Sequence, residues 1–271
     1  APIQVSYLGY PGTLAASYID YLIADRTLIP PESREHYTEK IVYLPYSYQV
    51  NDRHRVIAQK VFTREELGLP KEGFVFCCFN NNFKMLPETF AGWMRILKAV
   101  EGSVLWLFQD NSWALENLKQ EAVNHGIDLR RLVFAERMPL PEHLARHRVA
   151  DLFIDTFPCN AHTTASDALW AGLPVLTLTG QSFASRVAAS LLNAIGLPEL
   201  ITTTIQDYEA LAIELAKNPE KLKALKEKLA HQRLTTPLFD TPQFTKDLEQ
   251  AYLQMVQRYQ ADLPPEYLLI E

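Results

Sequence analysis

The feature that most constrains this chain is a regular alternation, from about residue 73 onward, between short apolar runs and amphipathic segments. The apolar runs have the length of buried strands, and the amphipathic segments have the spacing of helices of roughly 10–15 residues. Pro87 in a first turn and Gly126 at a segment end are typical helix boundaries. The sequence therefore predicts an α/β fold, a doubly wound, Rossmann-like parallel sheet with helices on both faces. The predicted strands are residues 74–79, 103–108, 131–135, 151–156, 174–178 and 199–203.

The two ends of the chain follow a different pattern. Two amphipathic segments, residues 220–233 and 244–259, predict C-terminal helices with solvated charged faces. The first 70 or so residues are less regular, with turn signals around short apolar runs. We therefore interpret residues 1–72 as a connecting segment or partial domain, and residues 73–271 as one Rossmann-like lobe with C-terminal helices.

Composition narrows the class of protein. A chain of 271 residues that is 48% hydrophobic can bury a sizeable core. Its net charge of −6 argues against a nucleic-acid or anionic-membrane surface, although a local basic pocket could hold a phosphate. No apolar run approaches the roughly 20 residues that cross a bilayer, and no signal peptide is evident, so we predict a soluble protein. The three cysteines lack metal-binding spacing and fit a reducing cytoplasm, and the non-Met first residue fits a piece of a longer protein.

Polar residues collect in the loops that follow the predicted strands. Four such loops, residues 80–84, 135–143, 156–164 and 179–186, carry polar or unusual side chains. In an open parallel sheet, ligands bind beyond the carboxyl ends of the strands, where the free N–H groups of helix N-termini favour anions. We expect these loops to converge on one anion-binding site.

The loop at residues 156–164 is the most informative. Thr163 and Thr164 fall in a first helical turn, where amides and hydroxyls suit phosphate oxygens, and Asp167 lies one turn later on the same face, where it can hold ribose hydroxyls. The alternative is that Thr163 caps the helix and Asp167 offsets its dipole, and the spacing does not decide between them. The position of His162 in the turn favours a ligand contact over a buried structural role.

Four other side chains are weaker candidates. Lys84 precedes a predicted helix N-terminus, where the dipole disfavours a cation unless an anion lies between them, so it indicates phosphate; a solvated lysine is the alternative. Met138 and His143 flank a turn that could hold a base. Arg186 points either to the ligand or to a surface carboxylate.

Several well-known site types are absent from the sequence. It contains neither the P-loop pattern nor the G-x-G-x-x-G dinucleotide pattern. Metal-binding motifs and the G-x-S-x-G elbow are also missing, and the short Gly-containing turn at residues 9–13 is weak support for phosphate binding. We therefore predict a nucleotide pocket without metal.

The motifs together resemble a known family. Residues 9–13, 79–84, 103–108, 141–143, 155–177 and 184–192 resemble the C-terminal catalytic lobe of the O-linked N-acetylglucosamine transferases, including plant and bacterial relatives. The resemblance extends from about residue 5 to about residue 260. It implies an inverting, metal-independent glycosyltransferase of the two-lobed GT-B class. Such enzymes transfer N-acetylglucosamine from UDP-GlcNAc to Ser or Thr hydroxyls of proteins, and residues 73–271 would be the nucleotide-sugar-binding lobe.

The resemblance also implies roles for the phosphate-facing residues. Lys84 matches the lysine that contacts the UDP phosphates and stabilises the leaving group, and Asn81 stands where animal enzymes have Gln. His162, Thr163 and Thr164 match the diphosphate-binding turn. Lys84 and His162 are thus the predicted catalytic residues, doing at the diphosphate what Mg²⁺ does elsewhere.

Other implied contacts lie at the nucleoside. His143 matches the histidine that packs on uracil, Met138 the position whose backbone reads the base, and Asp167 the ribose-binding acid. Leu140 stands where animal enzymes carry Lys, so one base contact is lost. Gly9 to Thr13 match a loop near the donor.

The resemblance further implies partners outside this chain. The upstream catalytic lobe and the tetratricopeptide repeats that recruit protein acceptors would precede Ala1, so no catalytic base is assigned. Two other functions stay open: a UDP-sugar-binding module without chemistry, and a UDP-GlcNAc epimerase of similar architecture, which would need acid/base carboxylates in the cleft.

Overall fold

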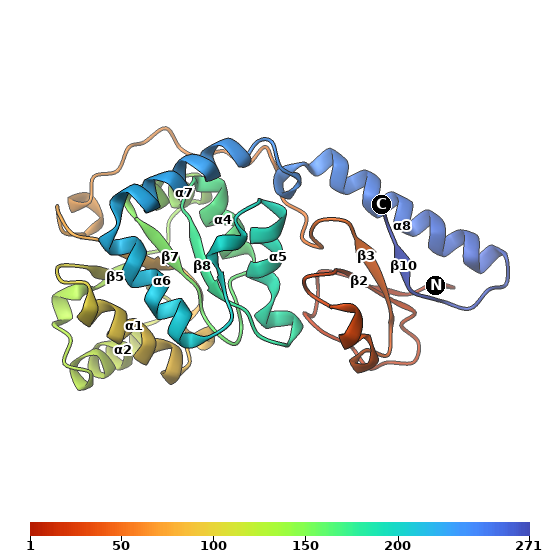
Figure 1. The fold of residues 1–271 in the computed structure, drawn as a ribbon, viewed down its shortest axis with the longest axis horizontal. Coiled ribbons are helices and arrows are strands. Elements are labelled where there is room, and N and C mark those ends of the chain that lie inside the picture. The colour runs from red at the N-terminus through yellow and green to blue at the C-terminus, as the bar shows by residue number, and fades with distance from the viewer.

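The computed structural model describes residues 1–271, which form two parallel sheets arranged end to end (Figure 1). The larger sheet has six strands in the order β6-β5-β4-β7-β8-β9. Its strands match the apolar runs of the sequence, and nearly all of their residues are buried, as expected for a parallel sheet covered on both faces. Their bounds are β4 Val75–Cys78, β5 Val104–Phe108, β6 Leu132–Ala135, β7 Leu152–Ile154, β8 Val175–Leu178 and β9 Ile201–Thr202.

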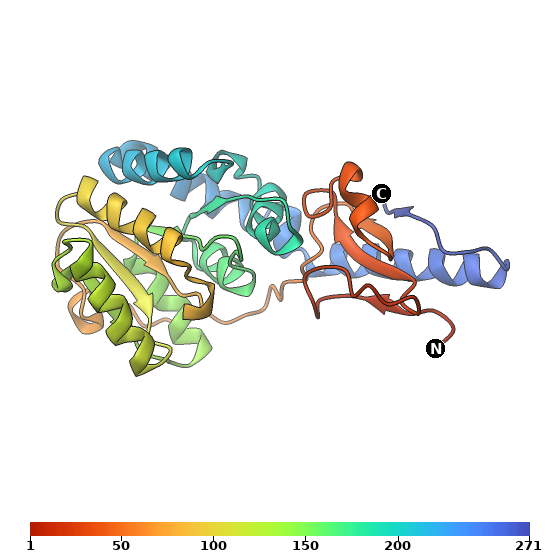
Figure 2. The same cartoon turned by 90° about the horizontal axis from the view of Figure 1, so that it is seen from below.

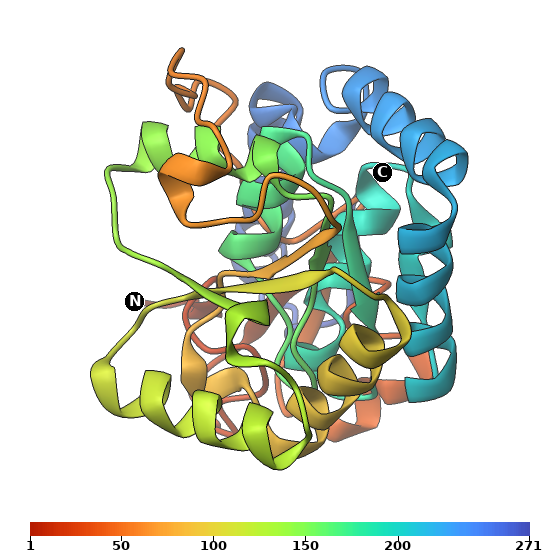
Figure 3. The ribbon, with the colours of Figure 1, turned by 90° about the vertical axis from the view of Figure 1, so that its left-hand side faces the viewer.

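Helices cover both faces of this sheet (Figure 3). Each begins and ends within a few residues of the amphipathic segments of the sequence, so the predicted doubly wound α/β fold is confirmed. The helices are α1 Pro87–Ala99, α2 Ser112–Asn124, α3 Leu140–Arg146, α4 Thr163–Ala171, α5 Val187–Ala194, α6 Ile205–Lys217 and α7 Pro219–Gln232. None of the helices has the length and apolar character that crossing a lipid bilayer requires.

The smaller sheet joins the two ends of the chain. Its order is β1-β2-β3-β10, so the C-terminal strand pairs with a strand from the first fifty residues. The last helix, α8 Thr241–Gln260, packs along it, and both termini lie at this end of the molecule (Figures 1 and 2). The boundary that the sequence suggested at residue 72 therefore assigns β10 and β3 to different parts of the chain, whereas the structure pairs them in one sheet. The strands are β1 Val5–Ser6, β2 Tyr21–Asp25, β3 Lys40–Leu44 and β10 Leu268–Leu269.

The two sheets share one core. A single cluster of 56 buried residues includes one face of the smaller sheet and the interior of the larger domain. Asp25, at the end of β2, is 1% exposed and accepts a hydrogen bond of 2.6 Å from Ser190 Oγ on α5. Arg186 Nε donates to Thr27 O at 2.6 Å and its Nη1 to Gly180 O at 2.8 Å. Arg186 therefore bridges the two parts of the molecule through backbone carbonyls and does not pair with a surface carboxylate.

Candidate functional site

The strand order of the larger sheet reverses between β4 and β7, and the loops after these strands therefore diverge around a crevice. Lys84 ends a short 3₁₀ turn after β4, and residues 155–162 connect β7 to α4. Lys84 Nζ donates to Asn160 O at 2.7 Å. The structure thus brings together the two loops that carry the principal predicted residues.

A buried carboxylate organises the loop after β7. Asp155 is 1% exposed and accepts hydrogen bonds from Thr156 N at 2.7 Å, Ala161 N at 2.6 Å and Thr177 Oγ1 at 2.7 Å. Burial raises the pKa of Asp155 to about 7, while the Thr177 hydroxyl, the two amides and nearby Lys84 lower it. Asp155 was not predicted as a site residue. Its sequence signal is an acid placed directly at the end of an apolar strand.

Asn80, also not predicted individually, ties the two loops together. Its Nδ2 donates to Thr156 Oγ1 at 2.7 Å, and its Oδ1 accepts a hydrogen bond from Thr164 Oγ1. The hydroxyl hydrogen of Thr164 is therefore used within the protein, whereas Thr163 is exposed. Asn81 is exposed beside them, at the start of the turn that ends at Lys84.

The N-terminus of α4 faces the same crevice. His162 is its N-cap residue and no side chain caps the helix, so the alternative that Thr163 serves as the cap is wrong. The first N–H groups of a helix have no partner within the helix and favour anions. Burial and the nearby Lys84 lower the pKa of His162 to about 4, so its imidazole is neutral at pH 7.

A cleft opens between this N-terminus and the smaller sheet. It has a volume of about 200 Å³ and brings the 8–11 turn against α4. Gly9 lines the cleft, but Thr13 does not: its hydroxyl donates to the buried Glu39 at 2.7 Å, so it fixes the turn from behind. The lining residues are Leu8, Gly9, Tyr10, Pro11, Tyr48, Gln49, Val50, His162 and Thr163.

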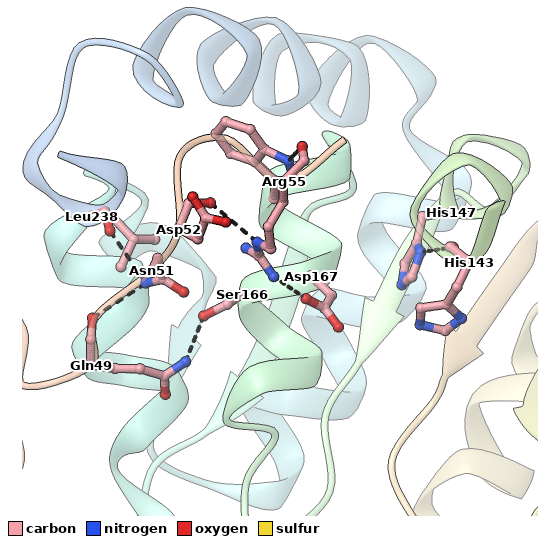
Figure 4. Close-up of polar contacts among 10 residues, drawn as sticks. Gln49, Asn51, Asp52, Arg55, His143, His147, Ser166, Asp167 and Leu238 are labelled. Carbon is pink, nitrogen blue, oxygen red and sulfur yellow. Dashed lines mark hydrogen bonds and ion pairs between the residues drawn. The ribbon is translucent and has the colours of Figure 1, made fainter. Parts of the chain in front are cut away.

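Asp167 lies one turn further along α4 and has an unforeseen partner. Arg55 Nη1 donates to Asp167 Oδ1, and the two side chains are only 16% and 15% exposed (Figure 4). Burial raises the pKa of Asp167, and Arg55 opposes that rise. Sequence reasoning missed Arg55 because it precedes Asp167 by 112 residues and has no local signal.

His143 stands on α3, beside α4 (Figure 4). Its ring centroid lies 5.3 Å from that of Phe79 and 4.8 Å from that of His147, and its Nδ1 lies 2.6 Å from Arg146 Nη2. Burial and Arg146 lower the pKa of His143 to about 4, so this ring is also neutral. Met138 is half-buried just before α3. The neutral imidazoles of His143 and His147 thus pack with Phe79 and the buried guanidinium of Arg146 beside the crevice.

The geometry as a whole suits a nucleoside diphosphate. Lys84 and the start of α4 offer a cation and free N–H groups, and Asp167 and His143 follow on the adjacent helices. No three His, Cys, Asp or Glu side chains gather as metal ligands would.

Comparison with known proteins places the chain among its relatives. Residues 1–61 and 57–248 match the model of glycosyl transferase family 41. The chain is 40% identical to the probable UDP-N-acetylglucosamine–peptide N-acetylglucosaminyltransferase SEC of Arabidopsis thaliana, over 100% of this chain and 28% of that protein. It is 32% identical to the corresponding probable SPINDLY protein of Petunia hybrida, over 97% of this chain and 28% of that protein.

Solved structures of glycosyltransferases also resemble this chain. A mutant of the Thermobaculum terrenum O-GlcNAc transferase matches with a TM-score of 0.82 and 32% identity, over 94% of this chain and 48% of that one. Sucrose-phosphate synthase from Thermosynechococcus elongatus matches at a TM-score of 0.57 and 18% identity, which concerns the fold alone. The fold is that of the GT-B glycosyltransferases, and the chain spans less than half the length of these relatives.

Proposed function

The chain belongs to glycosyl transferase family 41, and we propose that it is the donor-binding part of a protein O-GlcNAc transferase. In this proposal it binds UDP-GlcNAc, and the complete enzyme transfers the sugar to Ser or Thr hydroxyls with inversion and without a metal. The observation that carries the proposal is the convergence of Lys84 with the N-terminus of α4 at the point where the strand order reverses.

The diphosphate would lie between Lys84 and the start of α4. A cation next to a helix N-terminus is unfavourable by itself, and an anion between them removes the repulsion and accepts hydrogen bonds from both. Asn81 and the exposed hydroxyl of Thr163 are within the same loops, and we assign them to the phosphates as well. Thr164 would contribute through its backbone N–H, because its hydroxyl is bonded to Asn80.

These groups would act on the leaving group. Breaking the bond between the sugar and UDP places additional negative charge on the β-phosphate, and donors positioned in advance lower the barrier by stabilising that charge. Lys84 supplies a positive charge. His162 supplies a neutral imidazole, since burial keeps its pKa near 4. A catalytic base is not assigned to this chain.

The nucleoside would extend along α3 and α4. We assign Asp167 to the ribose hydroxyls, the His143 ring to the face of uracil, and the backbone at Met138 to the base edge. Leu140, the exposed first residue of α3, offers no charge to the base. Gly9 would approach the sugar from the opposite wall of the cleft, with Thr13 holding its turn in place.

The remaining partners would lie outside this chain. The relatives are longer, since the chain covers 28% of the plant protein and 48% of the bacterial structure. We propose that an upstream catalytic lobe and tetratricopeptide repeats supply the acceptor side, and that the complete protein works in the cytoplasm. The smaller sheet, with α8 and β10, would be the junction with that lobe.

Calorimetric titration tests the proposal. UDP, UDP-GlcNAc and ADP are added to the chain and to the full-length protein, first with a chelator and then with Mg²⁺. We expect UDP and UDP-GlcNAc to bind without metal, ADP to bind more weakly, and Mg²⁺ to add little. Failure of UDP to bind either folded protein without metal would overturn it. Binding without transfer by the full-length protein would indicate a nucleotide-sugar-binding module instead.

A further inference from the structure

Arg55 occupies an unusual position for a linker residue. It lies on the segment that leaves the smaller sheet after β3 and crosses to the larger domain (Figure 2). Its side chain is nevertheless largely withdrawn from water, at 16% exposure, and pairs with Asp167 on α4. A side chain of the linker that follows the smaller sheet thus forms an ion pair with a carboxylate of the larger domain.

The whole segment around Arg55 is fastened along one side of α4. Gln49 Nε2 donates to Ser166 Oγ at 2.8 Å (Figure 4). Trp170 Nε1 donates to Arg55 O at 3.1 Å. The guanidinium carbon lies 6.0 Å from the centroid of the Trp170 ring. These contacts fix the backbone and the side chain of Arg55 relative to α4, the helix whose N-terminus faces the crevice.

The ion pair uses only one of the two carboxylate oxygens of Asp167. Only Oδ1 of Asp167 meets Arg55, and the second oxygen points away from the guanidinium (Figure 4). Burial disfavours the ionised form of Asp167, and Arg55 offsets that effect. The carboxylate is therefore kept as an acceptor with one oxygen held in place.

We propose that Arg55 is a positioning residue for the nucleotide: it orients Asp167 so that the second carboxylate oxygen accepts hydrogen bonds from the ribose hydroxyls. The inference rests on the proposed function, in which Asp167 contacts the ribose. It adds a residue from outside the Rossmann-like motifs to the donor site.

The state of the guanidinium supports this role over a purely structural one. Arg55 Nη2 is buried and has no hydrogen-bond partner, so the pair is not fully satisfied by the protein. A buried ion pair with unsatisfied groups contributes little to folding compared with well-packed apolar residues. The arrangement is better explained by a requirement for an ionised, oriented carboxylate.

The test measures how strongly the protein recognises the ribose hydroxyls. Affinities for UDP and for 2′,3′-dideoxyuridine diphosphate are determined by calorimetry in the wild-type protein and in Arg55→Gln. Arg53→Gln is the matched control, because Arg53 lies in the same linker but is 40% exposed and pairs only loosely, at 3.7 Å, with Asp240. Thermal unfolding of each variant is followed in parallel.

We expect the wild-type protein and Arg53→Gln to prefer UDP over the dideoxy compound by about tenfold or more, as for hydrogen bonds to a charged acceptor. In Arg55→Gln the preference should fall to about twofold, mainly through weaker binding of UDP. If Arg55→Gln does not fold, Arg55→Lys is measured instead, since it keeps the charge but not the rigid fork, and a reduced preference is again expected.

Two outcomes contradict the inference and can be told apart. An undiminished preference in a folded Arg55 variant overturns it while leaving the proposed function intact. Absence of UDP binding to the wild-type protein overturns the proposed function, and this inference with it.

Discussion

The two ends proposed for the site, one for the diphosphate and one for the nucleoside, are built in different ways. The diphosphate end consists of one short segment, residues 155–164, and the loop after β4, held by several hydrogen bonds around the buried Asp155. The nucleoside end combines Asp167 on α4, His143 on α3 and Arg55 on the linker. The first end is a local motif of the larger sheet, and the second depends on how distant segments are placed.

This difference indicates what kind of effect a substitution at each end should have. Substitutions at the diphosphate end should act on the reaction directly or on the loop that carries it. Substitutions at the nucleoside end should act through packing and charge around neutral or paired groups. The following experiments test that division, in order of decreasing effect.

Lys84→Ala should have the largest effect on activity. In the proposed function, it removes the positive charge that faces the leaving diphosphate, so turnover of the complete enzyme should fall by about 10²–10³-fold, as for loss of one transition-state donor. UDP affinity should fall less, because only part of this interaction is present in the ground state. Initial rates and calorimetry measure the two effects.

Lys98→Ala is the control for that experiment. Lys98 is an exposed lysine on α1, far along the helix from the loop that carries Lys84. Its removal should leave both quantities unchanged. Equal losses of turnover and UDP affinity in the two variants, or an unchanged rate in Lys84→Ala, would contradict the proposed contact between Lys84 and the diphosphate.

Asp155→Asn should destabilise the protein and abolish UDP binding together. The amide oxygen can still accept from Thr156 N and Ala161 N, but the NH₂ group then meets the Thr177 hydroxyl, which donates to the carboxylate in the wild-type protein. We therefore expect the unfolding free energy to fall by about 2–4 kcal/mol. Chemical denaturation measures the loss. Asp110→Asn, at an exposed acid after β5, is the control and should be neutral. Full stability in Asp155→Asn would show that the loop does not depend on this carboxylate.

The same division explains how much the sequence could predict. The strands from β4 to β9 were predictable because strands buried on both faces leave uninterrupted apolar runs. The convergence of Lys84 with residues 162–164 was predictable because a helix N-terminus after a parallel strand is a local pattern with a known electrostatic character. Each of these features depends on residues that lie close together in the chain.

The features that the sequence did not predict depend on long-range contacts. β10 has only two residues, Leu268–Leu269, and becomes a strand by pairing with Val42 and Tyr43. Arg55 sits in an irregular linker, and nothing near it in the sequence identifies Asp167 as its partner. Thr13 belongs to a matching motif, yet its hydroxyl is bonded to Glu39 and not directed into the cleft. Pattern alone does not specify such pairings.

His147→Gln tests the neutral state of a buried imidazole at the nucleoside end. His147 is 1% exposed and burial lowers its pKa to about 3, so the folded state binds fewer protons than the unfolded state below the ordinary histidine pKa near 6.5. The wild-type protein should therefore lose stability relative to His147→Gln as the pH falls from about 6.5 to 4, by roughly 1.4 kcal/mol per pH unit. Denaturation curves at several pH values measure this difference. A stability difference that does not change with pH would mean that His147 is charged in the folded protein.

Thr163→Ala should have the smallest effect and separates two adjacent hydroxyls. Thr163 is exposed and lines the cleft, so its loss should weaken UDP binding by about threefold to tenfold, one neutral hydrogen bond, without changing the unfolding temperature. Thr164→Val removes a hydroxyl that donates to the buried Asn80, so it should lower stability by about 1–3 kcal/mol, because Asn80 Oδ1 is left without a donor. Calorimetry and thermal unfolding of both variants distinguish the cases. If Thr163→Ala lowers stability and leaves UDP affinity unchanged, the exposed hydroxyl supports the fold and the diphosphate is bound by the backbone N–H groups and Lys84 alone.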